Sequence, residues 1–150
     1  MPGASTARTC LKFIGTPGLN LLSYLIPMRL AARQVLRLAY YDPSRITKEQ
    51  LDAYTEPLSM PGARHALLQT ASQLVPSGAG ELIKKYKDIQ LPTLIIWGRQ
   101  DQIIPVKVGE LLAYDLPKSS LKIIEQCGHA PQEEKPEETI RLVMDFLRSL

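Results

Sequence analysis

The chain has 150 residues, of which 45% are apolar and 22% are charged, and these values are ordinary for one globular domain and exclude an intrinsically disordered chain. The net charge of +3 is unevenly distributed, because residues 1–41 hold five basic residues and no acidic one, whereas the remainder holds 13 basic and 15 acidic residues. Five basic residues spread over 41 positions, without a nucleic-acid-reading motif, argue against nucleic acid as a partner.

The cysteine count and the hydropathy further limit the class of protein. Cys10 and Cys127 are too few for a disulfide framework and match no metal-ligand spacing, which is typical of a reducing compartment. We therefore expect a cytoplasmic protein with no metal site and no cofactor. The longest nearly apolar window, residues 19–28, is about half the ~20 residues that a membrane-spanning helix requires, so no such helix is expected.

The first part of the chain begins with a loop and continues as helices. Residues 1–18 are rich in small residues, glycine and proline, and we expect a loop there whose composition also allows disorder. Residues 20–26 are predicted to form a short apolar helix that Pro27 interrupts. A good helix follows over residues 28–41, with three arginines at four-residue spacing on one face: Arg29, Arg33 and Arg37.

Two further helices are predicted before residue 75. Thr47 and Gln50 have the spacing of a capping box, which predicts a helix that begins there and runs to about residue 56. Residues 64–74 are predicted to form the next helix, whose buried side would consist of Leu67, Leu68, Ala71 and Leu74. A loop rich in proline and glycine over residues 76–80 is the strongest internal boundary in the chain.

The pattern changes to alternating helices and strands after this boundary. Five elements are expected in order: a short helix over 81–86, a strand over 93–97, a helix from Pro105 to about Tyr114, a strand over 121–125, and a last helix that starts at Pro136. Leu111 and Leu112 would pack on the sheet. The last helix carries apolar residues at helical spacing, namely Ile140, Val143, Met144 and Leu147.

Asp101 and His129 are the centre of chemistry in this part of the chain. Each follows the carboxyl end of a predicted strand, and parallel strands would deliver both side chains to one edge of the sheet, where open α/β sheets place their ligands. An aspartate in such a turn often only bonds its own backbone, and a lone histidine is usually a surface or packing residue. The combination of strand, connecting helix and nearby glycines favours an orienting acid beside a base.

The same residues carry a resemblance to a known family. The run from Pro92 to Asp101, PTLIIWGRQD, resembles the seventh strand and acid loop of the α/β-hydrolase fold. The run Cys127-Gly128-His129-Ala130-Pro131, followed by EKPE at 134–137, resembles the histidine loop and the start of the closing helix. Residues 20–75 are similar to the helical cap that many of these enzymes carry.

The resemblance implies an α/β fold in which a helical cap segment precedes a β-α-β-α unit from the C-terminal end of the hydrolase sheet, with the fold incomplete. By this resemblance the chain divides into an N-terminal loop at 1–18, a cap at 19–75 and the C-terminal part of the hydrolase core at 76–150. Asp101 would then orient His129, and His129 would deprotonate a nucleophile or a water. No serine or cysteine in the chain sits on a Gly-x-Ser-x-Gly elbow, so the nucleophile is expected outside this sequence and the chain alone is expected to be inactive.

Several functions are compatible with this assignment. Ester or carbon–carbon bond hydrolysis would use a serine nucleophile, whereas an epoxide hydrolase or haloalkane dehalogenase would use an aspartate. A substrate-binding role for Leu21, Leu22, Leu25 and Ile26 favours a small hydrophobic substrate. A different class of function is a truncated, non-catalytic binding or assembly module.

The expected partners follow from the same incomplete sheet. Its exposed edge would pair with a second copy or with a complementing N-terminal half. The three arginines also allow an interfacial helix on anionic lipid, but we favour a cap helix whose arginines face water, and a membrane surface is not expected as a partner.

Overall fold

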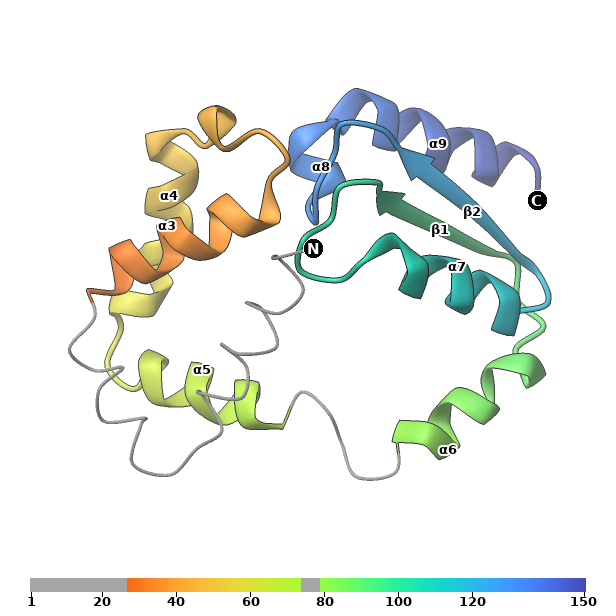
Figure 1. The fold of residues 1–150 in the computed structure, drawn as a ribbon, viewed down its shortest axis with the longest axis horizontal. Helices are drawn as coiled ribbons and strands as arrows, with labels where there is room; N and C mark the ends of the chain where they lie inside the picture. Colours follow the sequence, from red (N-terminus) through yellow and green to blue (C-terminus); the bar gives the residue numbers. More distant parts are fainter. Residues whose placement is uncertain (1–26, 74–78) are drawn as a thin grey trace. The chain divides into compact units, whose positions relative to one another are not determined.

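The computed structural model describes residues 27–73 and 79–150. The chain divides into two compact units, of which the first comprises Met1–Arg37 with Pro43–Ser77 and the second comprises Leu38–Asp42 with Gly78–Leu150. The five residues 38–42 therefore belong to the second unit although their neighbours on both sides belong to the first. The order of the elements can be followed in Figure 1.

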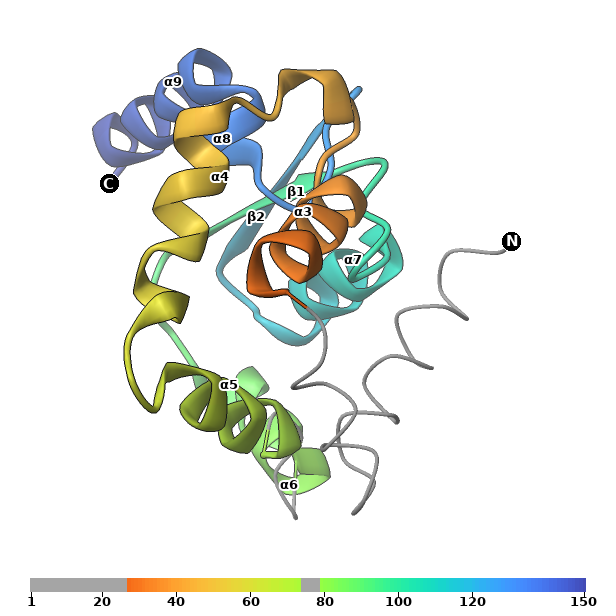
Figure 2. The ribbon, with the colours of Figure 1, turned by 90° about the vertical axis from the view of Figure 1, so that its left-hand side faces the viewer.

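The described part of the first unit is helical, as the sequence predicts. It contains α3 (Met28–Ala39), α4 (Lys48–Thr55) and α5 (Ala63–Ser72), with short 3-10 turns η1 (Pro43–Arg45) and η2 (Pro57–Ser59) between them, and Figure 2 shows the path from α3 through α4 to α5. α3 ends two residues before the predicted end. The stretch that belongs to the second unit consists of the last two residues of α3 and the three residues that follow them.

The capping box of α4 is present as predicted. The Thr47 hydroxyl accepts a hydrogen bond from the Gln50 amide at 3.1 Å, and the Gln50 side-chain oxygen accepts one from the Thr47 amide at 2.9 Å. Such reciprocal bonds satisfy two amide groups that the first turn of a helix would leave unpaired. Arg29 of α3 forms an ion pair with Asp52 of α4, and this hydrogen bond lowers the pKa of Asp52.

The predicted buried side of α5 is wrong where the structure describes it. Leu67 is 46% exposed and Leu68 only partly buried. Among the described elements, α5 packs mainly against the short η2 turn, which offers too little surface to cover a helix face. The side chain of Ala71 and the whole of Leu74 lie outside the described residues.

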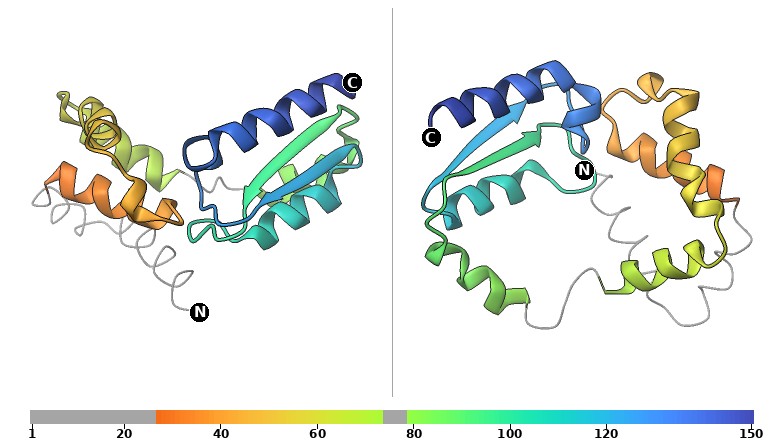
Figure 3. Two further views of the ribbon diagram at one scale, coloured as in Figure 1. Left: turned by 90° about the horizontal axis from the view of Figure 1, so that it is seen from above. Right: turned by 180° about the vertical axis from the view of Figure 1, so that it is seen from behind.

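The second unit is built on two parallel strands, which confirms the α/β class. β1 (Thr93–Gly98) pairs with β2 (Ser119–Ile124) in a register that runs from Thr93 opposite Ser119 to Gly98 opposite Ile124. The crossover helix α7 (Val106–Asp115) and the last helix α9 (Pro136–Arg148) cover opposite faces of this sheet (Figure 3). α6 (Ala79–Lys84) and the turn η3 (Tyr86–Asp88) precede β1.

One element of this unit is absent from the prediction. A four-residue helix, α8 (Pro131–Glu134), stands between β2 and α9, and it begins immediately after the histidine loop. β2 also begins two residues earlier than expected, at Ser119, whose hydroxyl donates to the carbonyl of Leu116 at 2.9 Å.

The core of the second unit lies at the carboxyl ends of its strands. Ile124 is 1% exposed, Cys127 is 0% exposed and Tyr40, from the 38–42 segment, is 2% exposed. The outer helices are covered less well than the sequence suggests. Leu111 of α7 is 52% exposed and does not pack on the sheet as predicted, since two strands are too narrow to cover the whole face of a helix.

Candidate active site

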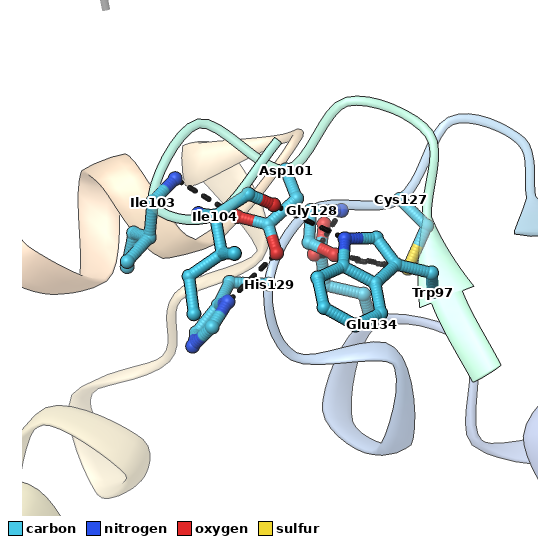
Figure 4. Close-up of polar contacts among 8 residues, drawn as sticks. All are labelled: Trp97, Asp101, Ile103, Ile104, Cys127, Gly128, His129 and Glu134. Atoms are coloured by element: carbon cyan, nitrogen blue, oxygen red, sulfur yellow. Dashed lines mark hydrogen bonds and ion pairs between the residues drawn. The ribbon is translucent and has the colours of Figure 1, made fainter. Parts of the chain in front are cut away.

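Asp101 lies in the loop after β1, and its carboxylate is fixed by three hydrogen bonds. Oδ1 accepts the backbone amides of Ile103 and Ile104, each at 2.8 Å, while Oδ2 lies 2.7 Å from Nδ1 of His129 (Figure 4). The side chain is 3% exposed. One oxygen therefore makes the local turn that aspartates commonly form, and the other remains directed at the histidine.

His129 lies in the loop after β2, with its side chain 39% exposed. A neutral imidazole that meets a carboxylate through Nδ1 carries its proton there, which leaves a lone pair on Nε2. The imidazole lines a cavity of about 150 Å³ together with Ile96, Trp97, Gly98, Asp101 and Pro131. The arrangement can accept a proton from a group placed in this cavity and stabilise the resulting imidazolium.

The two loops are joined by close backbone contacts. A Cβ atom on Gly98 would overlap the carbonyl oxygens of Gly128 and Cys127, so only glycine allows the two chains to approach this closely. Gln100 then bonds Cys127 twice, through its own amide to the Cys127 carbonyl at 2.9 Å and through Oε1 to the Cys127 amide at 3.1 Å. These bonds fix the distance between the loop that carries Asp101 and the loop that carries His129.

Gln126 turns the chain from β2 into the histidine loop. Its φ of 51° lies in the left-handed region, which non-glycine residues seldom occupy. Cys127 follows and is fully buried. Burial raises the pKa of its thiol to about 12, with a further contribution from the carboxylate of Glu134. A neutral, enclosed thiol is chemically inert.

Sequence reasoning missed the support of the histidine loop by α8 and by residues 38–42. Glu134 is 5% exposed; its Oε1 accepts the Gly128 amide at 2.6 Å and its Oε2 accepts the Tyr41 amide at 2.7 Å. The backbone amide of His129 donates to the carbonyl of Ala39. Tyr41 and Glu134 are 93 residues apart, so no local pattern could have indicated the contact. The only signal was the position of Glu134 within the EKPE run.

The other predicted site residues lie outside the part of the chain that the structure describes. These are Leu21, Leu22, Leu25 and Ile26. Among the residues that are described, no group of three or more histidine, cysteine, aspartate or glutamate side chains could hold a metal ion. No helix in the same ranges is long and apolar enough to cross a membrane.

A larger cavity occurs in the first unit. It measures about 480 Å³ and is lined by four basic side chains, two polar ones and three apolar ones: Arg29, Arg33, Arg37, Lys48, Ser44, Thr47, Pro43, Ile46 and Leu51. The three arginines of α3 share one exposed face, as their spacing predicts. The apolar segment that an interfacial helix would need lies outside the described residues, so the choice between the two interpretations of the arginines stays a prediction.

Two parallel strands, an acid after the first and a histidine after the second are the C-terminal signature of a hydrolase sheet. Residues 6–136 match the family model for the alpha/beta hydrolase fold, and the chain belongs to this family. It is 31% identical over 125 residues to a 2-hydroxy-6-oxo-6-phenylhexa-2,4-dienoate hydrolase of Comamonas testosteroni, an alignment that covers 83% of this chain and 44% of the relative.

Other relatives and solved structures agree with the family assignment. Monoacylglycerol lipase ABHD6 of Rattus norvegicus is 44% identical over 62 residues, which cover 41% of this chain and 18% of the lipase. The structure of Cfl2 from Burkholderia cenocepacia superposes with a TM-score of 0.79 at 22% identity, covers 97% of this chain and 49% of its own, and supports the fold alone. The chain spans about half the length of the dienoate hydrolases that it matches.

Proposed function

We propose that this chain supplies the base and the orienting acid of a hydrolase that cleaves an ester or a carbon–carbon bond in a small hydrophobic substrate. The observation that carries the proposal is the 2.7 Å contact between Nδ1 of His129 and a buried Asp101 carboxylate whose second oxygen is anchored by two amides. This contact fixes both the tautomer and the direction of the imidazole, which are the two requirements for a general base in a triad.

The chemistry would proceed in two stages. A serine hydroxyl attacks the substrate carbonyl while Nε2 of His129 takes its proton, and the Asp101 carboxylate stabilises the imidazolium. The imidazolium then returns the proton to the leaving group, which is an alkoxide from an ester or an enolate from a diketone-like substrate. Water, deprotonated by the same Nε2, releases the acyl group from the serine and regenerates both side chains.

The proposal places the nucleophile outside these 150 residues. No Gly-x-Ser-x-Gly sequence occurs in them, and the one described cysteine is buried and neutral. A serine elbow in the part of the relatives that this chain does not match would complete the triad. The alternative, an aspartate nucleophile as in epoxide hydrolases and haloalkane dehalogenases, would use His129 to activate water instead.

The relatives support the substrate class. The dienoate hydrolases are named for hydroxy-oxo-dienoate substrates, and the monoacylglycerol lipase for a glycerol ester. Both classes of substrate carry a carbonyl carbon that a serine can attack. The name of the dienoate hydrolases fits carbon–carbon cleavage and the name of the lipase fits ester cleavage, so the proposal includes both bonds.

A second candidate function, a non-catalytic assembly module, is favoured by the outer surface of the second unit. On α9, Ile140, Met144 and Leu147 are 62%, 44% and 54% exposed. The described sheet has two strands, so each strand has an unpaired edge. Surfaces of this kind bind other protein segments, and a chain that survives by such binding would not need a nucleophile.

Hydrolysis of p-nitrophenyl butyrate distinguishes the two candidates. The assay compares the 150-residue chain with the chain extended through the coding sequence upstream of residue 1. We expect no activity above background from the 150 residues alone and measurable turnover from an extension that contains a serine elbow.

The two histidines of the chain provide a matched pair of variants for this assay. His129→Ala should reduce kcat of the extended enzyme by about 10⁴-fold. His65→Ala, on the exposed surface of α5, should leave it unchanged. An elbow-containing enzyme in which both variants retain full activity would overturn the catalytic proposal and leave the assembly module.

A further inference from the structure

The carboxylate of Glu134 closes a ring of hydrogen bonds around the backbone of His129. Gly128, the residue before the histidine, donates its amide to Oε1 at 2.6 Å, and Tyr41 donates its amide to Oε2 at 2.7 Å. The His129 amide donates to Ala39, two residues before Tyr41. The ring therefore runs from Glu134 to the histidine loop, across to the 38–42 segment, and back to Glu134.

The ring is tightly packed as well as hydrogen-bonded. A Cβ atom on Gly128 would overlap the carbonyl oxygen of Ala39 and lie 2.8 Å from the Tyr41 nitrogen, so the two chains approach as closely as glycine permits. A second link lies beside it, where the Tyr40 hydroxyl donates to Glu133. Tyr40 is 2% exposed and Glu134 is 5% exposed, so both side chains are largely shielded from water.

A carboxylate is the group that this geometry requires. Each of its two oxygens faces a backbone N–H, and an ionised carboxylate accepts at both oxygens while donating at neither. A glutamine of the same shape would present an NH₂ group to one of the two amides, and two donors would then face each other. The site thus distinguishes glutamate from its closest isostere without any change of volume.

We propose that Glu134 is a positioning residue for the general base, holding the His129 backbone so that Nδ1 meets Asp101, and that residues Ala39–Tyr41 form the other half of this support. The inference rests on the proposed role of His129 and adds the parts of the chain that fix its position. It places a segment from the helical half of the sequence in the support of the catalytic loop, because residues 38–42 belong to the second unit.

The Nδ1 proton of His129 reports on this position without any need for catalysis. In the 150-residue chain, a proton held between Nδ1 and a buried carboxylate gives a low-field resonance that exchanges slowly with water. We expect Glu134→Gln to broaden this resonance or to accelerate its exchange by at least about tenfold, since the loop that carries the imidazole loses one of its two anchors.

A control variant and an internal reference signal separate positioning from general destabilisation. Glu137→Gln makes the same chemical change at an exposed carboxylate in the first turn of α9 and should leave the His129 signal unchanged. The indole proton of Trp97, which donates to the Ile104 carbonyl at 3.1 Å, reports on the acid loop and should persist in Glu134→Gln. An unchanged His129 resonance in Glu134→Gln overturns the proposal.

Hydrogen exchange of the unmodified chain tests the ring even if Glu134→Gln does not fold. The ring predicts that the amides of Tyr41, Gly128 and His129 are protected and open together, because breaking any one bond releases the others. A Tyr41 amide that exchanges at the rate of an open loop contradicts the ring.

In an extended enzyme with a serine elbow, Glu134→Gln should lower kcat by about tenfold to a hundredfold with little change in KM, and Glu137→Gln should lower neither. Failure of the hydrolase proposal would appear differently, as full activity in His129→Ala, and would leave the exchange results standing. A kcat unchanged by Glu134→Gln in an enzyme that depends on His129 would overturn the positioning role alone.

Discussion

At the scale of single residues, the site separates groups that can react from groups that cannot. Cys127 stands two positions before His129 and is enclosed, whereas the imidazole of His129 is 39% exposed beside a cavity. Because burial raises the pKa of Cys127 to about 12, its thiol stays neutral at physiological pH. The histidine loop thus keeps one reactive side chain accessible and another shielded.

The shielding of Cys127 predicts its chemical behaviour. In a Cys10→Ser variant, so that one thiol remains, reaction with a disulfide reagent at pH 8 should be undetectable in the native chain and complete after unfolding. The native thiol ionises at a higher pH than the unfolded one, whose pKa is 9.0, so the unfolded state binds fewer protons between pH 9 and about 12. Stability should therefore fall as the pH rises through this window, and urea titrations should show it. A native thiol that reacts at the unfolded rate would contradict this account.

At the scale of elements, the crossover helix α7 is held to β1 by a close contact between Trp97 and Gly109. A Cβ atom on Gly109 would lie 2.7 Å from the indole ring, which is too close for any side chain. The indole also donates to the carbonyl of Ile104, in the loop that supplies the amides for Asp101. Trp97 therefore connects the strand, the acid loop and the helix.

Gly109→Ala should displace the indole and loosen this connection. We expect a loss of about 1–3 kcal/mol of unfolding free energy from overpacking, together with a shift in the emission of Trp97, the one tryptophan of the chain. Chemical denaturation followed by fluorescence measures both. Gly80→Ala is a suitable control, because a Cβ atom there meets nothing within 4 Å. Equal stability and emission in the two variants would contradict the contact.

The elements also show which features a sequence can predict. β1 could be predicted because a β-branched, apolar run ended by glycine is typical of a buried strand. The contact between Asp101 and His129 followed from two parallel strands whose carboxyl ends lie at the same edge of the sheet. The contacts that hold the acid loop and the histidine loop in place could not be predicted from the sequence. Gln100 and Glu134 act through contacts with residues 27 and 93 positions away, and such contacts leave no periodicity in the sequence.

At the scale of the whole molecule, the second unit exposes apolar surface that a complete hydrolase sheet would cover. The uncovered residues of α9 recur along one side of the helix, and the described sheet presents an open edge on each strand. Edges and apolar faces of this kind promote pairing with other chains. Neither depends on the acid–base pair, so association and catalysis can be tested separately.

We predict that the 150-residue chain associates with itself in solution, and that the face of α9 contributes to this association. Size-exclusion chromatography with light scattering at increasing protein concentration should give a mass that rises above 16.7 kDa. The double variant Ile140→Lys with Leu147→Lys should shift the mass toward the monomer, because lysine in an apolar contact carries a large desolvation cost. The matched double variant Leu82→Lys with Ile83→Lys, at residues of α6 that are 51% and 48% exposed, should leave the mass unchanged.

A monodisperse monomer that unfolds cooperatively at every concentration would contradict the prediction. Equal masses for the two double variants would instead place the association at the strand edges.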